Sequence, residues 1–270
     1  MNSRNSRLIK IYSLTAIVLL TSFTLINMTR NKPTVYLIGD STVKNGSGKG
    51  ADGLWGWGNF LADHFDTNKV VIRNFALGGR SSRTFITGGN WEKVLNQLQK
   101  GDYVIMQFGH NDGSPLDDSA RARGTIRGVG NESKEIYNPI LKKKEIVYTY
   151  GWYMRQYISE TRGKGAISII CSPVPRNSFK DGRVVVAEES YALWAKQVAD
   201  STKTFYIPLG QMIAQKYNEW GQAKVATLFP KDNTHTNLGG AKINAECVAK
   251  GIQQLKKCTL RKYLLHRTFF

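Results

Sequence analysis

Residues 35–42 read Val-Tyr-Leu-Ile-Gly-Asp-Ser-Thr, an apolar run followed by a glycine and three polar side chains. A short apolar run that stops at a turn residue is typical of a strand buried on both faces of a sheet. Similar runs recur along the chain and alternate with helical patterns, which predicts an α/β fold with a parallel sheet covered on both faces. The predicted strands are residues 35–38, 70–75, 103–108, 166–171 and 204–207.

Helical patterns fill most of the segments between and after these strands. The predicted helices are residues 54–64, 91–99, 146–160, 187–201, 209–220 and 238–255. Residues 109–145 instead form a long polar segment rich in Gly, Asp and Arg, and a segment of this length without secondary structure is uncommon unless it serves a function. Neither a repeat nor a linker divides the chain, so residues 33–255 are predicted to form one domain.

The composition is that of a chain with a substantial core. Of its 270 residues, 41% are apolar and 21% are charged, which excludes a disordered or collagen-like protein. Its three cysteines, Cys171, Cys247 and Cys258, are too few for a disulfide framework and include no Cys-x-x-Cys pair. Cysteine chemistry is therefore not expected to carry the function, and the cysteines suggest no zinc site.

The net charge of +18 is concentrated at the two ends of the chain. Residues 1–32 and 256–270 each hold five basic residues and no acidic ones, which leaves +8 for residues 33–255. No zinc finger, recognition helix or arginine-rich motif accompanies the charge, so we expect no nucleic-acid partner. A moderately basic body can concentrate an acidic polysaccharide. Residues 256–270 are predicted to form a basic C-terminal tail outside the domain.

Residues 1–32 have the pattern of a targeting segment. Arg4, Arg7 and Lys10 precede the apolar run 11–26, which has about the length of a signal-peptide core and is short for a bilayer span. We therefore expect a secreted, periplasmic or cell-envelope protein. No small-x-small cleavage motif follows the run, so an uncleaved N-terminal membrane anchor stays open as the alternative.

Chemically useful residues follow the predicted strands. Ser41 lies in a tight turn that can expose its hydroxyl and its own N–H on the same side. Gly79 and Arg80 follow the second strand, where a backbone N–H can approach a substrate oxygen closely, and Asn111 after the third offers an amide donor. Ligands of an open parallel sheet bind beyond the carboxyl ends of its strands, which makes these residues candidates for one site.

Asp232 and His235 stand three residues apart just before the last predicted helix. This spacing lets the carboxylate reach the ring Nδ1–H while Nε2 faces outward, which makes the imidazole a competent base. An isolated Asp-x-x-His is more often a helix-start acid beside a surface histidine. The combination with the strand-end residues favours the catalytic interpretation.

Taken in order, these segments resemble the sequence blocks of the SGNH, or GDSL-like, hydrolases. The resemblance covers residues 34–255 and is closer to the rhamnogalacturonan acetylesterases of carbohydrate esterase family 12. It is carried by Gly39-Asp40-Ser41-Thr42, Asn74-Phe75-Ala76, Gly79-Arg80-Ser81, Phe108 to Asp112, and residues 148–153, 171–177 and 228–236. It implies a three-layer α/β/α fold around a parallel, flavodoxin-like sheet of about five strands.

The resemblance also implies a role for each site residue. Ser41 is expected to be the nucleophile, His235 its base and Asp232 the group that orients the imidazole. The N–H of Ser41, the N–H of Gly79 and the amide of Asn111 are expected to form the oxyanion hole. Asp40 and His110 match the same blocks and are interpreted as structural residues of the loops, and no metal or cofactor is needed.

Aromatic and basic residues near these blocks are candidate substrate contacts. Trp55 and Trp57 follow the nucleophile turn and could stack on sugar rings, although indoles are as often core residues. Basic side chains that could pair with uronic carboxylates are Arg80, Arg83 and Arg176, with ordinary surface arginines as the alternative.

The sequence thus predicts an exported serine esterase that removes O-acetyl groups from an acetylated polysaccharide, most readily pectic rhamnogalacturonan. Two alternatives stay open. One is a lipase or thioesterase of the same superfamily, which would need an apolar acyl groove. The other is a non-catalytic carbohydrate-binding protein with the same fold. A membrane contact is expected only through the N-terminal segment.

Overall fold

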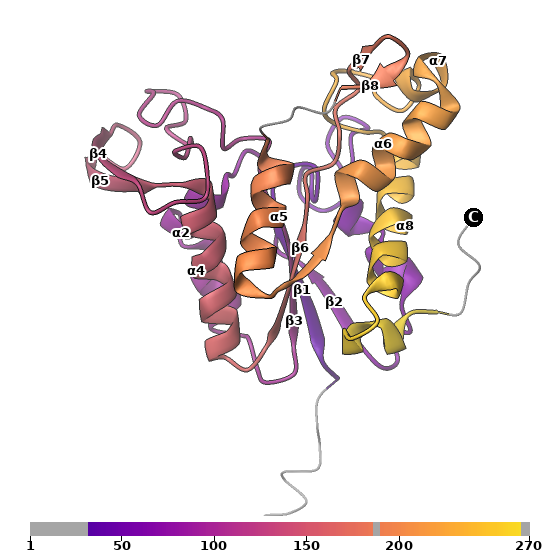
Figure 1. The fold of residues 1–270 in the computed structure, drawn as a ribbon, viewed down its shortest axis with the longest axis horizontal. Coiled ribbons are helices and arrows are strands. Elements are labelled where there is room, and N and C mark those ends of the chain that lie inside the picture. The colour runs from indigo at the N-terminus through magenta and orange to yellow at the C-terminus, as the bar shows by residue number, and fades with distance from the viewer. Residues whose placement is uncertain (1–31, 186–189, 266–270) are drawn as a thin grey trace, which may run out of the picture. The chain divides into compact units, whose positions relative to one another are not determined.

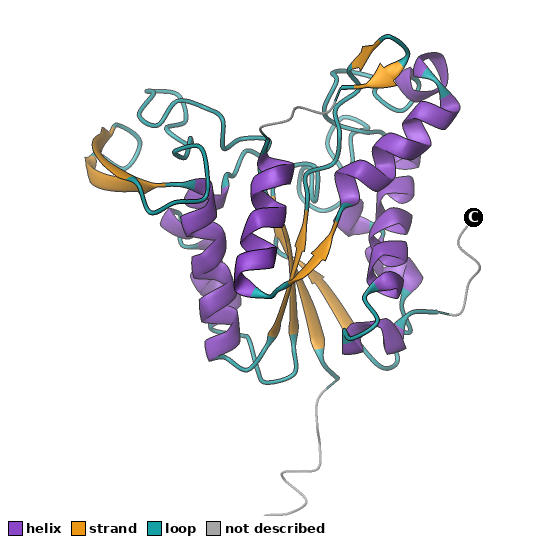
Figure 2. Ribbon diagram, in the orientation of Figure 1, coloured by secondary structure: helices purple, strands orange, loops and turns teal. Residues whose placement is uncertain are grey.

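Five strands form one parallel sheet in the order β2-β1-β3-β6-β9 (Figures 1 and 2). They are β1 (Thr34–Gly39), β2 (Val71–Asn74), β3 (Tyr103–Gln107), β6 (Ile167–Cys171) and β9 (Phe205–Ile207). The order is that of flavodoxin-like sheets, so the predicted architecture is confirmed. The computed structural model describes residues 32–185 and 190–265, and the predicted leader in residues 1–31 lies outside them.

Helices cover both faces of the sheet and complete the three layers. One layer consists of α2 (Ser82–Thr87), α3 (Asn90–Leu95), α4 (Tyr150–Gly163) and α5 (Tyr191–Thr202). The other consists of α6 (Leu209–Trp220), α7 (Gln222–Ala226) and α8 (Leu238–Gln254). Among the described residues, no helix combines the length and the apolar character that crossing a bilayer requires.

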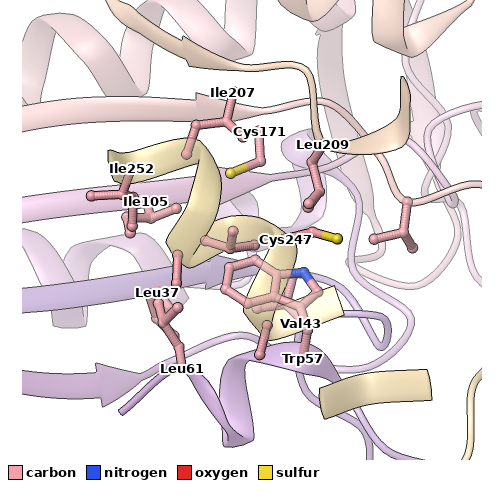
Figure 3. Packing of buried hydrophobic residues seen from close by; sticks show 14 of the residues in the cluster. Leu37, Val43, Trp57, Leu61, Ile105, Cys171, Ile207, Leu209, Cys247 and Ile252 are labelled. Atoms are coloured by element: carbon pink, nitrogen blue, oxygen red, sulfur yellow. The ribbon is translucent and has the colours of Figure 1, made fainter. Parts of the chain in front are cut away.

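Alternation along each strand divides the buried side chains between two cores. Leu37 and Ile105 point to the core under α6 and α8, whereas Ile38 and Met106 point to the core under α4 and α5. Figure 3 shows the first core, where Cys171 and Cys247 pack among aliphatic side chains. A fully buried aliphatic side chain stabilises a fold by about 1.5–3 kcal/mol, so both faces hold the sheet.

The predicted helix over residues 54–64 is wrong in type. The segment forms two short 3₁₀ helices, η1 (Trp57–Asn59) and η2 (Leu61–His64). The backbone here runs against the nucleophile loop, because a Cβ atom on Gly56 would lie 2.2 Å from the Val43 carbonyl carbon. This close approach, which only glycine permits, fixes the path of the chain and prevents one continuous helix.

A β-hairpin occupies the end of the long polar segment, which the sequence did not predict. Strand β4 (Ser133–Asn138) pairs antiparallel with β5 (Lys143–Tyr148). Residues 146–148, predicted as the start of a helix, therefore belong to a strand, and α4 begins after Thr149, whose side chain accepts from Trp152 N–H. A second, two-residue pair consists of β7 (Phe179–Lys180) and β8 (Arg183–Val184).

The C-terminal boundary of the domain lies beyond the predicted residue 255. The described part of the predicted tail contains a 3₁₀ helix, η3 (Thr259–Tyr263), in which Leu260 is fully buried. Leu264 forms a β-bridge with Phe65, and Leu265 N–H donates to the His64 carbonyl. These contacts make residues 256–265 part of the core packing, and residues 266–270 lie outside the described residues.

Replacing Gly56 by alanine tests the close approach to Val43. Because the added methyl would meet backbone that cannot rotate away, we expect Gly56→Ala to lower the free energy of unfolding by about 1–3 kcal/mol or more. Gly163, near the end of α4, has open space at its Cβ position, so Gly163→Ala is the matched control and should be neutral or stabilising. Denaturant titration of both variants measures the difference, and equal effects would contradict the packing described here.

Candidate active site

Ser41 stands in a tight turn at the carboxyl end of β1. The N–H groups of Val43 and Lys44 donate to the Asp40 carbonyl at 3.1 and 3.0 Å, and Thr42 N–H donates to the Asp40 side chain at 2.9 Å. These bonds close the turn and leave the Ser41 side chain at its apex. Within the described residues, the Ser41 N–H donates to no acceptor, so it remains available to a ligand.

Ser41, His235 and Asp232 form a continuous hydrogen-bonded chain. Ser41 Oγ lies 2.7 Å from His235 Nε2, and His235 Nδ1 lies 2.7 Å from Asp232 Oδ2. Asp232 Oδ1 also accepts from the backbone N–H groups of Thr234 and His235, each at 2.7 Å. The structure thus brings together the three residues that the sequence predicts as a triad, in an arrangement that can move the serine proton to the imidazole.

The charge of the Asp232 carboxylate is maintained although it stands partly out of water. Partial burial opposes ionisation, but hydrogen bonds from His235 and Thr234 hold the pKa of Asp232 below its ordinary value. The side chain is 43% exposed, so solvent screens part of its interaction with the imidazole. The loop of residues 232–236 is held next to the segment that follows the Ser41 turn, because Trp55 N–H donates to the Thr236 carbonyl at 2.8 Å.

The three predicted oxyanion-hole donors border the same space. Gly79 adopts φ +73°, a left-handed conformation that favours glycine, and a Cβ on the neighbouring Gly78 would lie 3.7 Å from Ser41 Cβ. Asn111 Nδ2 donates to the Arg80 carbonyl at 2.8 Å, which leaves its second N–H for a ligand. The position is suitable for stabilising negative charge on an oxygen beside Ser41.

A cleft of about 640 Å³ opens over these groups. Its described walls include Ser41, His235, Gly79 and Asn111. Among the described residues that line it there are four arginines, Arg80, Arg121, Arg123 and Arg176, and no aspartate or glutamate. Of the lining side chains that the structure describes, only Ala120 and Ile140 are apolar. A larger cavity of about 1400 Å³ shares His110 and Arg176 but contains neither Ser41 nor His235, so the chemistry belongs to the smaller cleft.

Two predicted substrate contacts are wrong. Trp57 is fully buried in the core, and its Nε1–H donates to Gln107 Oε1 at 2.9 Å, so it cannot stack on a sugar (Figure 3). Arg83 is also fully buried and pairs with Glu145 at 2.8 Å. The Arg83 guanidinium further donates to the carbonyls of Leu116, Ala122 and Gly124. Because protein acceptors occupy its donors, Arg83 holds residues 116–145 in place and does not meet a substrate.

The other predicted contacts have different surroundings. Arg80 and Arg176 are exposed and line the cleft. Arg176 donates to Thr234, the residue before His235, which fixes its guanidinium near the predicted triad. Trp55 is half-buried, packs its ring on Phe60 at 5.3 Å and does not line the cleft. Its described contacts indicate a structural role.

The sequence did not single out Arg121 and Arg123, which the polar segment brings into the cleft. Arg123 donates to Ser114 Oγ at 3.0 Å and to the Gly79 carbonyl at 3.3 Å, so its guanidinium stands next to an oxyanion-hole residue. Burial and the neighbouring Arg121 lower the pKa of Arg123. Their only signal in the sequence is an Arg-x-Arg pair in a polar segment, and this pattern alone does not predict where the two side chains lie in the fold.

A buried hydrogen-bond relay supports the nucleophile turn from behind. Trp57 donates to Gln107, Gln107 Nε2 donates to Thr42 Oγ1, and Thr42 Oγ1 donates to Asp40 Oδ1 at 2.8 Å. The other oxygen, Asp40 Oδ2, faces His110 Nδ1 at 3.2 Å. Full burial opposes the charge of Asp40, yet His110 and Thr42 hold its pKa below the ordinary value.

His110 joins this relay to the loop after β6, because its Nε2 lies 3.0 Å from the Val174 carbonyl. Both ring nitrogens therefore face acceptors. The loops after β1, β3 and β6 are linked through one imidazole, which is the structural role interpreted from the sequence. This arrangement leaves neither ring nitrogen of His110 free to take a proton from Ser41.

Asp112 is a second buried carboxyl, and it has an unusual environment. Its Oδ1 accepts from Ser82 N–H at 3.0 Å and from Ser82 Oγ, whereas its Oδ2 has no partner among the described residues. Burial raises the pKa of Asp112 to about 7. The nearby Asp40 charge acts in the same direction, whereas the hydrogen bonds from Ser82 lower the pKa. A neutral carboxyl here lets the β3 loop pack against α2 without a second buried charge.

The sequence was compared with models of known protein families. A model of the GDSL-like Lipase/Acylhydrolase family matches residues 37–243, which include Ser41, Asp232 and His235. The chain belongs to this family. As a family member it is an ester hydrolase of the SGNH type, as the sequence predicts, and the matched range covers the whole parallel sheet apart from the start of β1.

Two relatives match most of the chain in sequence. The chain is 32% identical over 220 residues to a rhamnogalacturonan acetylesterase of Emericella nidulans, covering 81% of this chain and 84% of the relative. It is 33% identical over 226 residues to the probable rhamnogalacturonan acetylesterase YesY of Bacillus subtilis, covering 82% and 93%. Both similarities extend over most of the domain.

Solved structures share the fold. YxiM of Bacillus subtilis superposes with a TM-score of 0.68 at 24% identity, and the match covers 84% of this chain and 58% of that one. This chain therefore spans little more than half of YxiM. The acetylxylan esterase Axe2 of Geobacillus stearothermophilus superposes with a TM-score of 0.53 at 17% identity, covering 81% and 93%.

The raised pKa of Asp112 predicts a pH-dependent contribution to stability. Below pH about 4 the carboxyl is protonated in both states, whereas between about 4 and 7 only the unfolded chain loses its proton, so folding stability decreases as pH rises and levels off above about 7. Asp112→Asn removes this titration while its amide oxygen can still accept from Ser82.

The measurement compares urea unfolding of wild type and Asp112→Asn from pH 4 to 8. Because carboxyls far from Asp112 titrate alike in both proteins, the difference between them reports on Asp112 and the neighbouring Asp40. We expect the variant to gain stability relative to wild type as pH rises, by up to about 4 kcal/mol for a full shift of this size. A difference that stays constant across the range would contradict a raised pKa.

Proposed function

We propose that this protein removes O-acetyl groups from an acetylated acidic polysaccharide, with pectic rhamnogalacturonan as the first candidate. The observation that carries the proposal is the Ser41–His235–Asp232 hydrogen-bonded chain beside a cleft whose described lining has four arginines and no carboxylate. The names of the curated relatives, rhamnogalacturonan acetylesterases, support the same substrate class. The pattern of residues 1–32 supports action outside the cytoplasm.

The geometry supports a two-step acyl transfer. Ser41 Oγ attacks the acetyl carbonyl while His235 Nε2 takes its proton, and the oxygen charge that develops meets the Ser41 and Gly79 N–H groups and the Asn111 amide. Collapse of the intermediate expels the sugar alkoxide, which receives the proton from His235. A water molecule, deprotonated by the same imidazole, then releases acetate and restores Ser41. Asp232 stabilises the imidazolium in both steps.

The lining of the cleft argues against the lipase or thioesterase alternative. A long acyl chain needs a continuous apolar groove, but in the described part of the chain Ala120 and Ile140 are the only apolar side chains that border the cleft. Polar atoms and guanidinium groups suit a short acyl group on a hydroxylated, negatively charged polymer. The complete proton-transfer chain also favours catalysis over carbohydrate binding alone, because binding requires no aligned serine, imidazole and carboxylate.

Acetate release from two acetylated polymers tests the proposed substrate. We expect acetylated rhamnogalacturonan to be hydrolysed faster than neutral acetylated xylan, with a gap that narrows as salt screens the arginines. Ser41→Ala should lower both rates by at least about a thousandfold while the melting temperature is retained. Equal rates that do not respond to salt would contradict the acidic preference, and activity that survives in Ser41→Ala would contradict the mechanism.

Arg121 provides a sharper test of the charge argument, because it is exposed in the cleft and does not touch the triad. Losing one guanidinium–carboxylate contact costs about 1.4 kcal/mol, so Arg121→Gln should raise KM for the acidic polymer about tenfold. Hydrolysis of a neutral chromogenic acetate should change much less. Arg127→Gln is the control, because Arg127 lies over the Trp194 ring outside the cleft; a similar KM increase in this control would contradict a local role for Arg121.

A further inference from the structure

The β4–β5 hairpin concentrates apolar side chains on the surface. Seven large apolar side chains are exposed in the described residues, and four of them belong to this hairpin. They are Tyr137, Ile140, Leu141 and Ile146, with exposures of 60%, 49%, 37% and 51%. Figure 1 shows the hairpin projecting from the body above α2 and α4, clear of the sheet. Such a concentration in a soluble domain indicates a contact surface.

The register of the hairpin separates an anchored face from an open one. Tyr137 pairs with Lys144, Ile146 with Glu135 and Tyr148 with Ser133, and directly paired residues of antiparallel strands share a face. The opposite face is buried against the domain through Ile136, Asn138 and Val147, and Glu145 on that face pairs with Arg83. The hairpin is therefore held rigidly from behind.

An aromatic stack extends the open face toward α4. Trp152, in the first turn of α4, lies on Tyr148 with ring centroids 4.0 Å apart and planes within 11°. Both rings are half-buried, and Tyr153 supports them edge-on. Together with Tyr137 and Ile146 they form what we name the hairpin platform: Tyr137, Ile146, Tyr148 and Trp152.

Charge and position indicate what binds there. Residues 133–148 contain four exposed lysines and two acids, of which Glu145 is buried with Arg83 and Glu135 pairs with Lys144 at 2.9 Å. The hairpin is thus positively charged, like the cleft. Its tip reaches the active site, because Ile140 lines the cleft together with Arg121. An acidic chain that places an acetyl group at Ser41 can continue onto the hairpin.

We propose that the hairpin platform binds the polysaccharide chain outside the catalytic cleft, its rings stacking on sugar rings. This inference rests on the proposed function for its ligand. Flat, rigid aromatic side chains provide contact area at low entropic cost, and the net positive charge of the hairpin adds long-range attraction to an anionic polymer. The platform would lengthen the binding site beyond the sugar that carries the acetyl group.

Binding is measured with de-esterified rhamnogalacturonan in a Ser41→Ala background, so that the result does not depend on catalysis. Removing one exposed stacking ring costs about 1.4 kcal/mol, a tenfold change in Kd, so Tyr137→Ala should weaken binding about tenfold. Tyr137→Ala with Trp152→Ala should weaken it further. Leu238→Ala, which removes an exposed apolar side chain on α8 that lines neither cavity, is the matched control and should bind as the background does.

Catalysis gives the second readout. In the active protein, Tyr137→Ala should lower the ratio of kcat/KM on acetylated polymer to kcat/KM on a small chromogenic acetate about tenfold. Tyr137 is 60% exposed, so this variant tests the proposal even if Trp152→Ala perturbs α4. An unchanged ratio and unchanged Kd would overturn the proposal.

Two other occupants of the platform would also overturn it. If sedimentation shows a dimer that Tyr137→Ala dissociates, the platform is an interface between copies of this chain. If the wild type binds anionic phospholipid vesicles and Tyr137→Ala does not, while polymer binding stays equal, the platform contacts lipid. Polymer binding by the Ser41→Ala background without acetate release by the active protein would refute the proposed function and leave the binding inference standing.

Discussion

A carboxylate with no exposure to water, Asp40, organises the active site. A buried charge is tolerated only when donors surround it, and here Thr42 and His110 supply them from the loops after β1 and β3. His110 extends the connection to Val174 after β6. The position of Ser41, next to Asp40, therefore depends on three loops closing around one charge, and the 2.7 Å contact with His235 depends on that position.

The two sides of the nucleophile turn have opposite character. Behind Ser41, buried polar side chains form a series of hydrogen bonds in which each side chain donates to the next, from Trp57 to Asp40. This series fixes the turn. In front of it, Asp232 is 43% exposed and four arginines line the cleft. Rigid support behind an open, positively charged cleft suits the proposed action on an acidic polymer, which has to reach a nucleophile held in one position.

Buried parallel strands could be predicted from the sequence because each is an apolar run that ends at a turn, and the residues after those turns contain the candidate site. The resemblance to known hydrolases assigned the triad. Whether a given arginine or tryptophan is buried or lines the cleft could not be predicted from the sequence. Arg83, for example, is buried and pairs with Glu145, which is 62 positions away on a hairpin that the sequence does not indicate. The hairpin has one open face and a lysine run, so its sequence shows neither clear strand alternation nor helical periodicity. Without the hairpin in the predicted fold, the positions of Arg121 and Arg123 in the cleft could not be predicted either.

The central claim is that Ser41 is a nucleophile activated by His235, and labelling with a serine-directed phosphonate tests it most directly. The reagent needs only an activated hydroxyl, so the result does not depend on the choice of polysaccharide. Intact-mass analysis and peptide mapping should show one adduct, on Ser41, and His235→Ala should slow its formation at least about a thousandfold. Labelling of a different serine, or labelling of His235→Ala at the wild-type rate, would contradict this account.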